Sequence, residues 1–221
     1  MAIDPDEFNI PVKDYDFSKA TQITSLIDQM AQAGGFTATK LATARDILLD
    51  MKQQSDAVDG DMSKVTNWLS FPACLCATGT RSFFVEAVKT KMFNVLSTTC
   101  GTLDHDIARS YKDYYHGAFE LDDIELGEHS LMRLGNVIVP NSSYGEIIEA
   151  VVMPALEEIY QDRLKETGKT GADAWIGFGS LHLGWEIGKR IGTPSSFIYW
   201  AWKNQIPVCI PGITDGSIGA Q

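Results

Sequence analysis

Long apolar runs, numerous cysteines and an excess of positive charge are all missing from this sequence. No stretch of about 18 apolar residues occurs, so no membrane-spanning helix is expected. Four cysteines in 221 residues are too few for a secreted disulfide scaffold, so a reducing, cytoplasmic location is expected. The net charge of −11 repels phosphate backbones and disfavours nucleic-acid binding. A basic protein segment or a cationic small molecule suits this charge better.

The N-terminal residues lack the features of a targeting segment. MAIDPDEFNI is acidic and contains no apolar run, so neither a signal peptide nor an arginine-rich transit peptide is expected. Two prolines predict an irregular N-terminal arm over residues 1–17. One α/β domain is expected to follow it over residues 18–221. This domain is expected to begin with two helices, the first capped by Ser18 and ended at Gly34, the second capped by Thr39.

Apolar runs of strand length alternate with helical patterns through the rest of the chain. Strand, loop and helix follow one another twice after residue 65, which is typical of a parallel sheet. The fold class expected is therefore α/β, a Rossmann-like doubly wound parallel sheet preceded by N-terminal helices and incomplete at its C-terminal end. The strands are predicted near residues 65–71, 93–99, 137–139 and 206–210.

Other segments carry weaker patterns. Residues 53–64 and 111–134 are polar and are expected to be irregular. Residues 144–164 have the longest helical pattern, which Pro154 should kink or split.

Three predicted loops leave the carboxyl ends of strands, where parallel α/β sheets bind ligands. They are residues 73–81, 98–106 and 211–221, and each contains small residues that allow close approach of a ligand. A nucleotide-type site is one interpretation, and simple tight turns are the other. The sequence has neither the G-x-G-x-x-G nor the G-x-x-x-x-G-K-[ST] pattern, so neither standard phosphate-binding motif applies.

Several polar residues in these loops have two interpretations. Asp104 and Asp106, placed at the start of a helix, would complement its dipole, and His105 between them could be an acid or base. Asp215 could bind a ribose or a cation, or cap the next helix. Cys74, Cys76, Cys100 and His105 form a chemically acceptable zinc set, but their spacing fits no zinc finger or ribbon, so no metal site is predicted. Buried cysteine is also common as an apolar filler.

Six segments taken together resemble the deoxyhypusine synthase family, in the family's order and over about residues 15–221. The R-L-G-N-V-I-V-P-N and I-T-D-G-S-I-G blocks are the most specific. The segments are Tyr15–Phe17, Ala77–Arg81, Ser97–Asp106, Arg133–Asn141, Ser196–Trp202 and Ile206–Gly219. The T-T-C-G-T-L-D-H-D form is most similar to archaeal members and related bacterial proteins.

The resemblance implies a Rossmann-like homotetramer that uses NAD to oxidise spermidine. It also implies transfer of an aminobutyl group, through an imine on an enzyme lysine, to one lysine of the hypusine-carrying translation factor precursor. This peptidyl-lysine modification is an NAD-dependent transferase reaction. No nucleic acid or membrane is an expected partner.

The family's cofactor residues carry over unevenly. In the first NAD loop Ala73, Cys74 and Ala77 stand where the family has polar side chains. The second and third loops match better, with Thr99, Cys100, Gly101, Asp215 and Ser217 implied to bind NAD.

The substrate residues depart further from the family. Asp104 keeps one of two expected acids, His105 replaces the other, and Ala220 stands in place of an acid that contacts the polyamine. The catalytic lysine of the family lies beyond Gln221, so the 221-residue chain is expected to be inactive alone. Two alternatives stay open: a non-catalytic subunit that pairs with a complete paralogue, or a related NAD-dependent enzyme acting on another amine such as agmatine.

Overall fold

The computed structural model describes residues 10–221, which divide into two compact units with the boundary between Asp61 and Met62. The division falls inside the segment 53–64 that the sequence marks as polar. Two predictions concern residues 1–9, which lie outside the described residues: the absence of a targeting peptide and the first half of the N-terminal irregular segment, residues 1–17. The domain boundary predicted after residue 17 stays a prediction.

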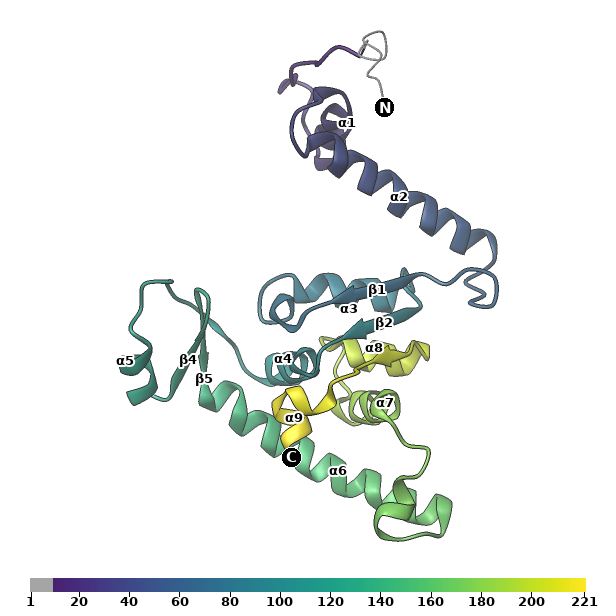
Figure 1. Ribbon diagram of the computed structural model, residues 1–221, viewed down its shortest axis with the longest axis vertical. Helices are drawn as coiled ribbons and strands as arrows, with labels where there is room; N and C mark the ends of the chain where they lie inside the picture. Colours follow the sequence, from purple (N-terminus) through teal and green to yellow (C-terminus); the bar gives the residue numbers. More distant parts are fainter. Residues whose placement is uncertain (1–9) are drawn as a thin grey trace, which may run out of the picture. The chain divides into compact units, whose positions relative to one another are not determined.

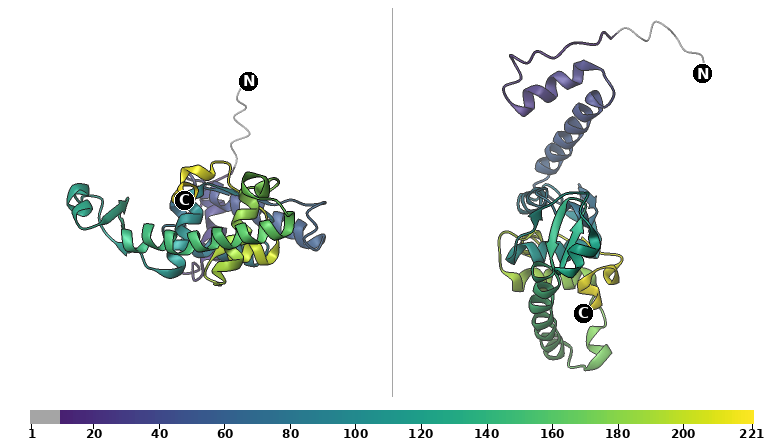
Figure 2. Two further views of the ribbon diagram at one scale, coloured as in Figure 1. Left: turned by 90° about the horizontal axis from the view of Figure 1, so that it is seen from below. Right: turned by 90° about the vertical axis from the view of Figure 1, so that its left-hand side faces the viewer.

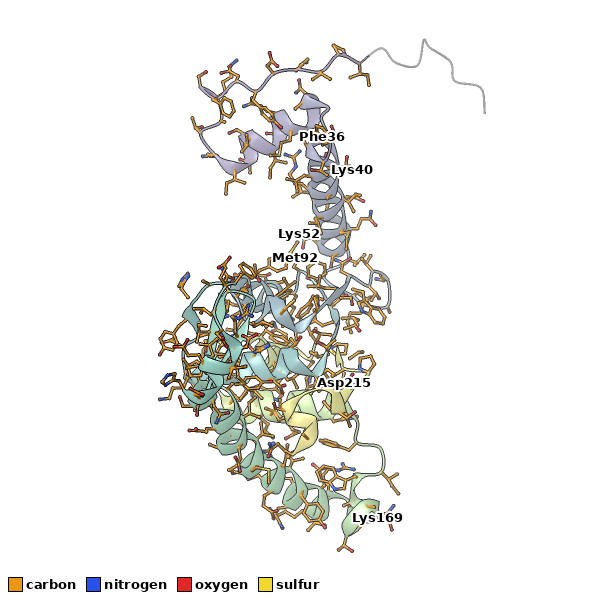
Figure 3. All side chains as sticks on the ribbon, turned by 60° about the vertical axis from the view of Figure 1, so that its left-hand side comes forward. Phe36, Lys40, Lys52, Met92, Lys169 and Asp215 are labelled. Atoms are coloured by element: carbon orange, nitrogen blue, oxygen red, sulfur yellow. The ribbon has the colours of Figure 1, made fainter. Side chains whose placement is uncertain are left out.

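The first unit is a pair of packed helices. α1 (Ile23–Ala33) ends at Gly34, whose φ of 70° is left-handed, as the sequence predicts. α2 (Ala38–Ala57) continues into the segment expected to be a loop, because Lys52, Gln53 and Gln54 favour helix. Gln22 and Thr37 precede the two helices, so the predicted caps Ser18 and Thr39 are wrong. Figure 3 shows Phe36 at the turn between the helices, where its side chain is fully exposed.

The second unit is built on a three-stranded parallel sheet. β1 (Trp68–Phe71), β2 (Val95–Thr98) and β6 (Val208–Cys209) lie in the order β1-β2-β6 (Figure 1). α3 (Arg81–Lys89) connects the first two strands, and five α-helices lie between the second strand and the third. The predicted parallel α/β arrangement is therefore confirmed.

The two faces of this sheet differ in burial. Phe71 stacks on Phe84 of α3 with ring centroids 3.9 Å apart and meets Phe197 of α8 (Phe197–Asn204) edge-on. On the opposite face Trp68 is 58% exposed, and its neighbours are exposed or half-buried. Within residues 62–221, the helical core therefore covers the face that carries Phe71.

The helix after β2 starts earlier than predicted. α4 (Cys100–Tyr111) begins directly after Thr99, which has extended backbone, so the helix takes in the Cys-Gly-Thr segment. Asp104 and Asp106 consequently lie in its second turn and cannot neutralise its first amides. The dipole explanation of these acids is wrong.

The remaining helices surround α4. α6 (Gly145–Thr167) contains Pro154 but is not split by it, and it extends beyond residue 164. α7 (Ser180–Ile191) packs on α8, where Gly188 allows the backbones to meet. The short α9 (Ser217–Ala220) follows β6 and ends the described chain. No helix in residues 10–221 is long and apolar enough to cross a membrane.

Residues 111–134, expected to be irregular, contribute to a second sheet. β3 (Tyr115–His116), β5 (Val137–Pro140) and β4 (Leu131–Leu134) form an antiparallel sheet in that order, and α5 (Asp123–Glu128) precedes β4. Asp122 caps α5 by accepting hydrogen bonds from the amides of Ile124 and Glu125. Residues 113–140 are called the arm below, because they project beyond α4 from the start of α6 (Figures 1 and 2).

Candidate functional site

A groove lies at the carboxyl edge of the parallel sheet, where two of the three predicted loops, residues 98–106 and 211–221, meet the end of the first strand. Its volume is about 480 Å³. Such an edge is where open α/β sheets bind ligands. The lining residues come from all three strand ends and are Ser70, Phe71, Pro72, Ser97, Thr98, Thr99, Pro211, Gly212 and Asp215.

The first two loops are in direct contact. The amide of Ala73 donates a hydrogen bond to Thr99 Oγ1 at 3.2 Å. A Cβ at Gly101 would lie 3.1 Å from the Cβ of Ala73, so glycine here permits the loops to close together. The small residues therefore serve a tight contact between loops, as one of the two interpretations expected. The second of these loops also lines the groove at the sheet edge, so the two interpretations do not exclude each other.

The second loop supplies the start of α4. The first amides of a helix have no acceptor inside the helix, and they carry the positive end of its dipole. They lie next to Thr99, whose hydroxyl is already bonded to Ala73 and does not cap them. This helix start is suited to an anionic group.

Asp215 supplies the carboxylate of the groove. It ends a short 3-10 turn over Ile213–Asp215, and a Cβ at Gly212 would lie 2.2 Å from its Oδ2, so glycine leaves room for the carboxylate. In the part of the chain that the structure describes, no group donates a hydrogen bond to this carboxylate. An exposed carboxylate with free lone pairs can accept from ligand hydroxyls.

Asp104 lies behind the groove and is fully buried. Its carboxylate accepts hydrogen bonds from the Tyr144 hydroxyl at 2.8 Å and from the amides of Ser217 and Ile218 at 2.8 and 3.0 Å. These amides open α9, so Asp104 caps a helix distant in sequence. Contact with a substrate would require α9 to move.

Asp106 has the same role toward another helix. Its carboxylate accepts from the Ser196 hydroxyl at 2.6 Å and from the first amides of α8. The Arg81 guanidinium forms an ion pair with it at 2.9 Å, which compensates the buried charge. The two acids of α4 therefore fix the starts of α9 and α8.

His105 points to a cluster of tyrosines. Its Nδ1 lies 3.0 Å from the Tyr114 hydroxyl, and its ring is tilted against that of Tyr144. Burial lowers the pKa of His105 below its ordinary value, against the raising effect of Asp104. A neutral imidazole can accept or donate a proton, so the acid–base interpretation stays a prediction.

The cysteines behave as apolar side chains. Cys76 and Cys100 are buried, and burial is the main cause that raises their thiol pKa values to about 12 and about 11. Cys74 is exposed. Across residues 10–221, no three His, Cys, Asp or Glu side chains are arranged to hold a metal ion, so the four residues considered as a zinc set do not form one.

The residues predicted to bind a cofactor occupy three kinds of place. Thr99 and Asp215 line the groove. Ser217 instead donates its hydroxyl to Tyr144, and Ala77 is buried beside a second cavity at the base of the arm. The others belong to the same loops without lining the groove and are Ala73, Cys74, Cys100 and Gly101.

Sequence reasoning missed Ser70 and Ser97, which line the groove from the strands themselves. The two residues are paired in register across β1 and β2, and alternation along each strand places them on the face opposite Phe71 and Thr98. The signal was present as a small polar residue at the same position of two apolar runs, W-L-S-F and V-L-S-T.

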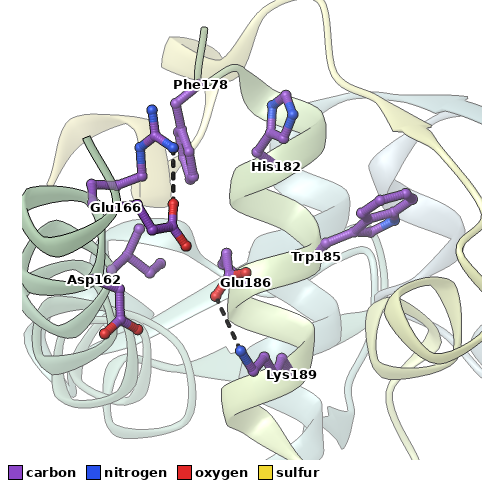
Figure 4. Close-up of a pocket in the computed structure, with 9 residues that line it drawn as sticks. Asp162, Glu166, Phe178, His182, Trp185, Glu186 and Lys189 are labelled. Atoms are coloured by element: carbon purple, nitrogen blue, oxygen red, sulfur yellow. Dashed lines mark hydrogen bonds and ion pairs between the residues drawn. The ribbon is translucent and has the colours of Figure 1, made fainter. Parts of the chain in front are cut away.

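Another cavity, of about 150 Å³, lies between α6 and α7 (Figure 4). Its charged side chains are mostly paired, Arg163 with Glu166 and Lys189 with Glu186. It lies away from the strand ends and gathers none of the residues singled out from the loops.

A parallel α/β protein with a ligand groove at its strand ends is the class that this fold and site define. The family model for deoxyhypusine synthase matches residues 25–221. The chain is 47% identical over 211 residues to a "Probable deoxyhypusine synthase" of Picrophilus torridus, covering 96% of this chain and 61% of that protein. A protein of the same description from Thermoplasma acidophilum is 46% identical over the same shares. The chain belongs to the deoxyhypusine synthase family.

A solved structure supports the fold. A crystal structure described as a "putative deoxyhypusine synthase" from Entamoeba histolytica superposes with a TM-score of 0.61 at 19% identity, covering 95% of this chain and 65% of that one. At this identity the likeness concerns the fold. The chain spans about 61% of the length of the curated relatives named above.

Proposed function

We propose that this chain is part of an NAD-dependent transferase. The whole protein moves the aminobutyl group of spermidine to a lysine of the hypusine-carrying translation factor precursor. The observation that carries this proposal is the meeting of the second and third family loops with the end of β1 at one groove, with Thr99 and Asp215 both lining it. The proposed protein works in the cytoplasm as a homotetramer.

The groove suits part of a dinucleotide. Asp215 would accept hydrogen bonds from ribose hydroxyls, and the first amides of α4 would hold a phosphate. The hydroxyls of Ser70 and Ser97 add polar contacts on the sheet side. NAD bound here would supply the capacity to take up a hydride from the amine.

The identity of the amine substrate is less constrained than the identity of the cofactor. Asp104 is buried and engaged with α9, and Ala220 is exposed and carries no charge. The described chain therefore offers fewer free acids to a polyamine than the family pattern implies. This favours, as a second candidate, a related NAD-dependent enzyme acting on another amine such as agmatine.

A third candidate is a non-catalytic subunit of an assembly with a complete paralogue. The exposed sheet face around Trp68 favours it, because such a face is usually covered in an α/β protein. In this case the paralogue supplies the catalytic lysine.

The test joins residues 1–221 to the segment by which the Picrophilus torridus relative extends beyond the match. The chimera is incubated with NAD, the precursor and either spermidine or agmatine. We expect the precursor to gain one aminobutyl group on one lysine with spermidine, detected by mass spectrometry. Modification with agmatine alone would support the second candidate, and no modification with either amine would contradict the transferase proposal.

A further inference from the structure

The arm, residues 113–140, concentrates negative charge. It carries six Asp or Glu residues and one Arg, a net charge of −5, in about an eighth of a chain whose total is −11. The single cation, Arg133, is already held by both oxygens of Asp123 at 2.9 Å. The remaining acids are exposed and include Glu120, Glu125 and Glu128.

The arm also exposes large apolar side chains among these acids. Ile124 is 78% exposed and Phe119 is 63% exposed. Within the arm only Ile138 and Val139 are buried, although its three strands and α5 are fully formed. A surface that mixes exposed aromatic and aliphatic groups with charge is typical of a protein-binding site. The other exposed apolar residues are Tyr115, Leu121, Met132 and Leu134.

The charge of the arm discriminates among classes of partner. Nucleic acid and anionic membrane surfaces are repelled by it. A second copy of this chain, docked arm to arm, would place six acids against six acids. A polypeptide segment that presents lysine or arginine together with apolar side chains complements both properties of the arm.

We infer that the arm is the docking surface for a basic, apolar segment of the acceptor protein that carries the modified lysine. The assignment to the acceptor rests on the function proposed above, whereas the chemistry of the partner rests on the arm alone. The arm projects beyond α4 at the start of α6, so a bound segment has access to it (Figures 1 and 2).

Binding of the unmodified translation factor precursor to the 221-residue chain tests this inference by calorimetry at low salt. The arm variant is Glu120→Lys/Glu125→Lys/Glu128→Lys. The matched control is Glu149→Lys/Glu157→Lys/Asp173→Lys, which changes the net charge equally at exposed sites outside the arm. We expect the arm variant to bind at least about tenfold more weakly and the control to stay within about twofold of the unmodified chain.

A second variant addresses the apolar contribution. Ile124→Ser removes an exposed side chain that packs little within the arm, and circular dichroism checks that the fold is kept. We expect this variant to bind the precursor more weakly than the unmodified chain, by a factor that does not change with salt concentration.

Two results would overturn the inference. Equal loss in the two charge variants would overturn the inference, because it would show a general charge effect. Absence of precursor binding to the unmodified chain would overturn it as well. The proposed function would be judged separately, by modification of the precursor in the chimera assay, which measures chemistry rather than docking to the arm.

Discussion

Single residues fix where the elements of this chain touch. At Gly188 a Cβ would lie 2.3 Å from the carbonyl oxygen of Ile198, so the contact between α7 and α8 requires glycine. Gly184, one turn earlier in the same helix, has no atom within 4 Å of an added Cβ. These two glycines look alike in the sequence, and only the packing separates them.

We predict that Gly188→Ala lowers the free energy of unfolding by about 2–3 kcal/mol or more, because backbone cannot yield as a side chain can. The control, Gly184→Ala, should be neutral or stabilising by up to about 1 kcal/mol, since alanine favours helix. Urea denaturation of both variants measures the difference. Equal stabilities would contradict the contact between α7 and α8.

His105 leads to a prediction about pH. Burial holds its pKa below the ordinary value of 6.5, so the unfolded chain takes up a proton first as the pH falls. The stability linked to His105 is therefore fully present above pH 6.5 and is lost as the pH drops from there toward the lower folded pKa. Replacing it by glutamine should flatten this part of the dependence in urea denaturation on either side of pH 6.5. An unchanged dependence in His105→Gln would show that the imidazole is not buried as described.

At the scale of elements, long-range caps hold the site together. Asp104 connects α4 to α9, and Asp106 connects α4 to α8. Both carboxylates are fully buried, and the helix starts that they cap lie 90 to 114 residues away in the sequence. The loop that carries Asp215 is thereby attached to the loop that carries Thr99.

We predict that Asp104→Ala frees the start of α9. Two amides and a phenol would lose their acceptor, at a cost of about 2–4 kcal/mol. Amide hydrogen exchange at Ser217 and Ile218 should become markedly faster, and Asp104→Asn should be intermediate because its amide oxygen still accepts. Unaltered protection in Asp104→Ala would contradict the capping role.

The sequence predicted the regular elements well where the apolar pattern was strong. β1, β2 and β6 lie within the apolar runs that predicted them, because strands that contribute to a core carry apolar side chains. Within the arm the sequence predicted only β5, since the other two strands and α5 bury few side chains and leave little periodic signal. It also placed the start of α4 four residues late, at Asp104, because acids are common in a first helical turn.

Part of the site was predictable for the same reason. The convergence of the strand ends follows from the parallel sheet, whereas Thr99 was implied by the family resemblance and Asp215 by both its loop and the resemblance. The capping roles of Asp104 and Asp106 depend on contacts with residues distant in sequence, which no local pattern encodes. Ser70 and Ser97 required the strand register.

At the scale of the whole molecule, the chain covers about 61% of its curated relatives and has the fold of the family. The family resemblance predicts that the catalytic lysine follows the residues matched here. We therefore predict that the 221-residue chain alone gives no product from spermidine, NAD and the precursor, as measured by mass spectrometry of the precursor. Product formed by the purified chain would show that the catalytic group lies within these residues.

The proposed function requires that the strand-end groove binds NAD. Amide hydrogen exchange of the 221-residue chain with and without NAD tests it most directly, with Asp215→Ala as the comparison variant. We expect slower exchange at residues 98–102 and 211–216, little change in the arm or in α1 and α2, and a weaker effect in the variant. Protection confined to other segments, such as the cavity between α6 and α7, or no protection at all, would contradict it.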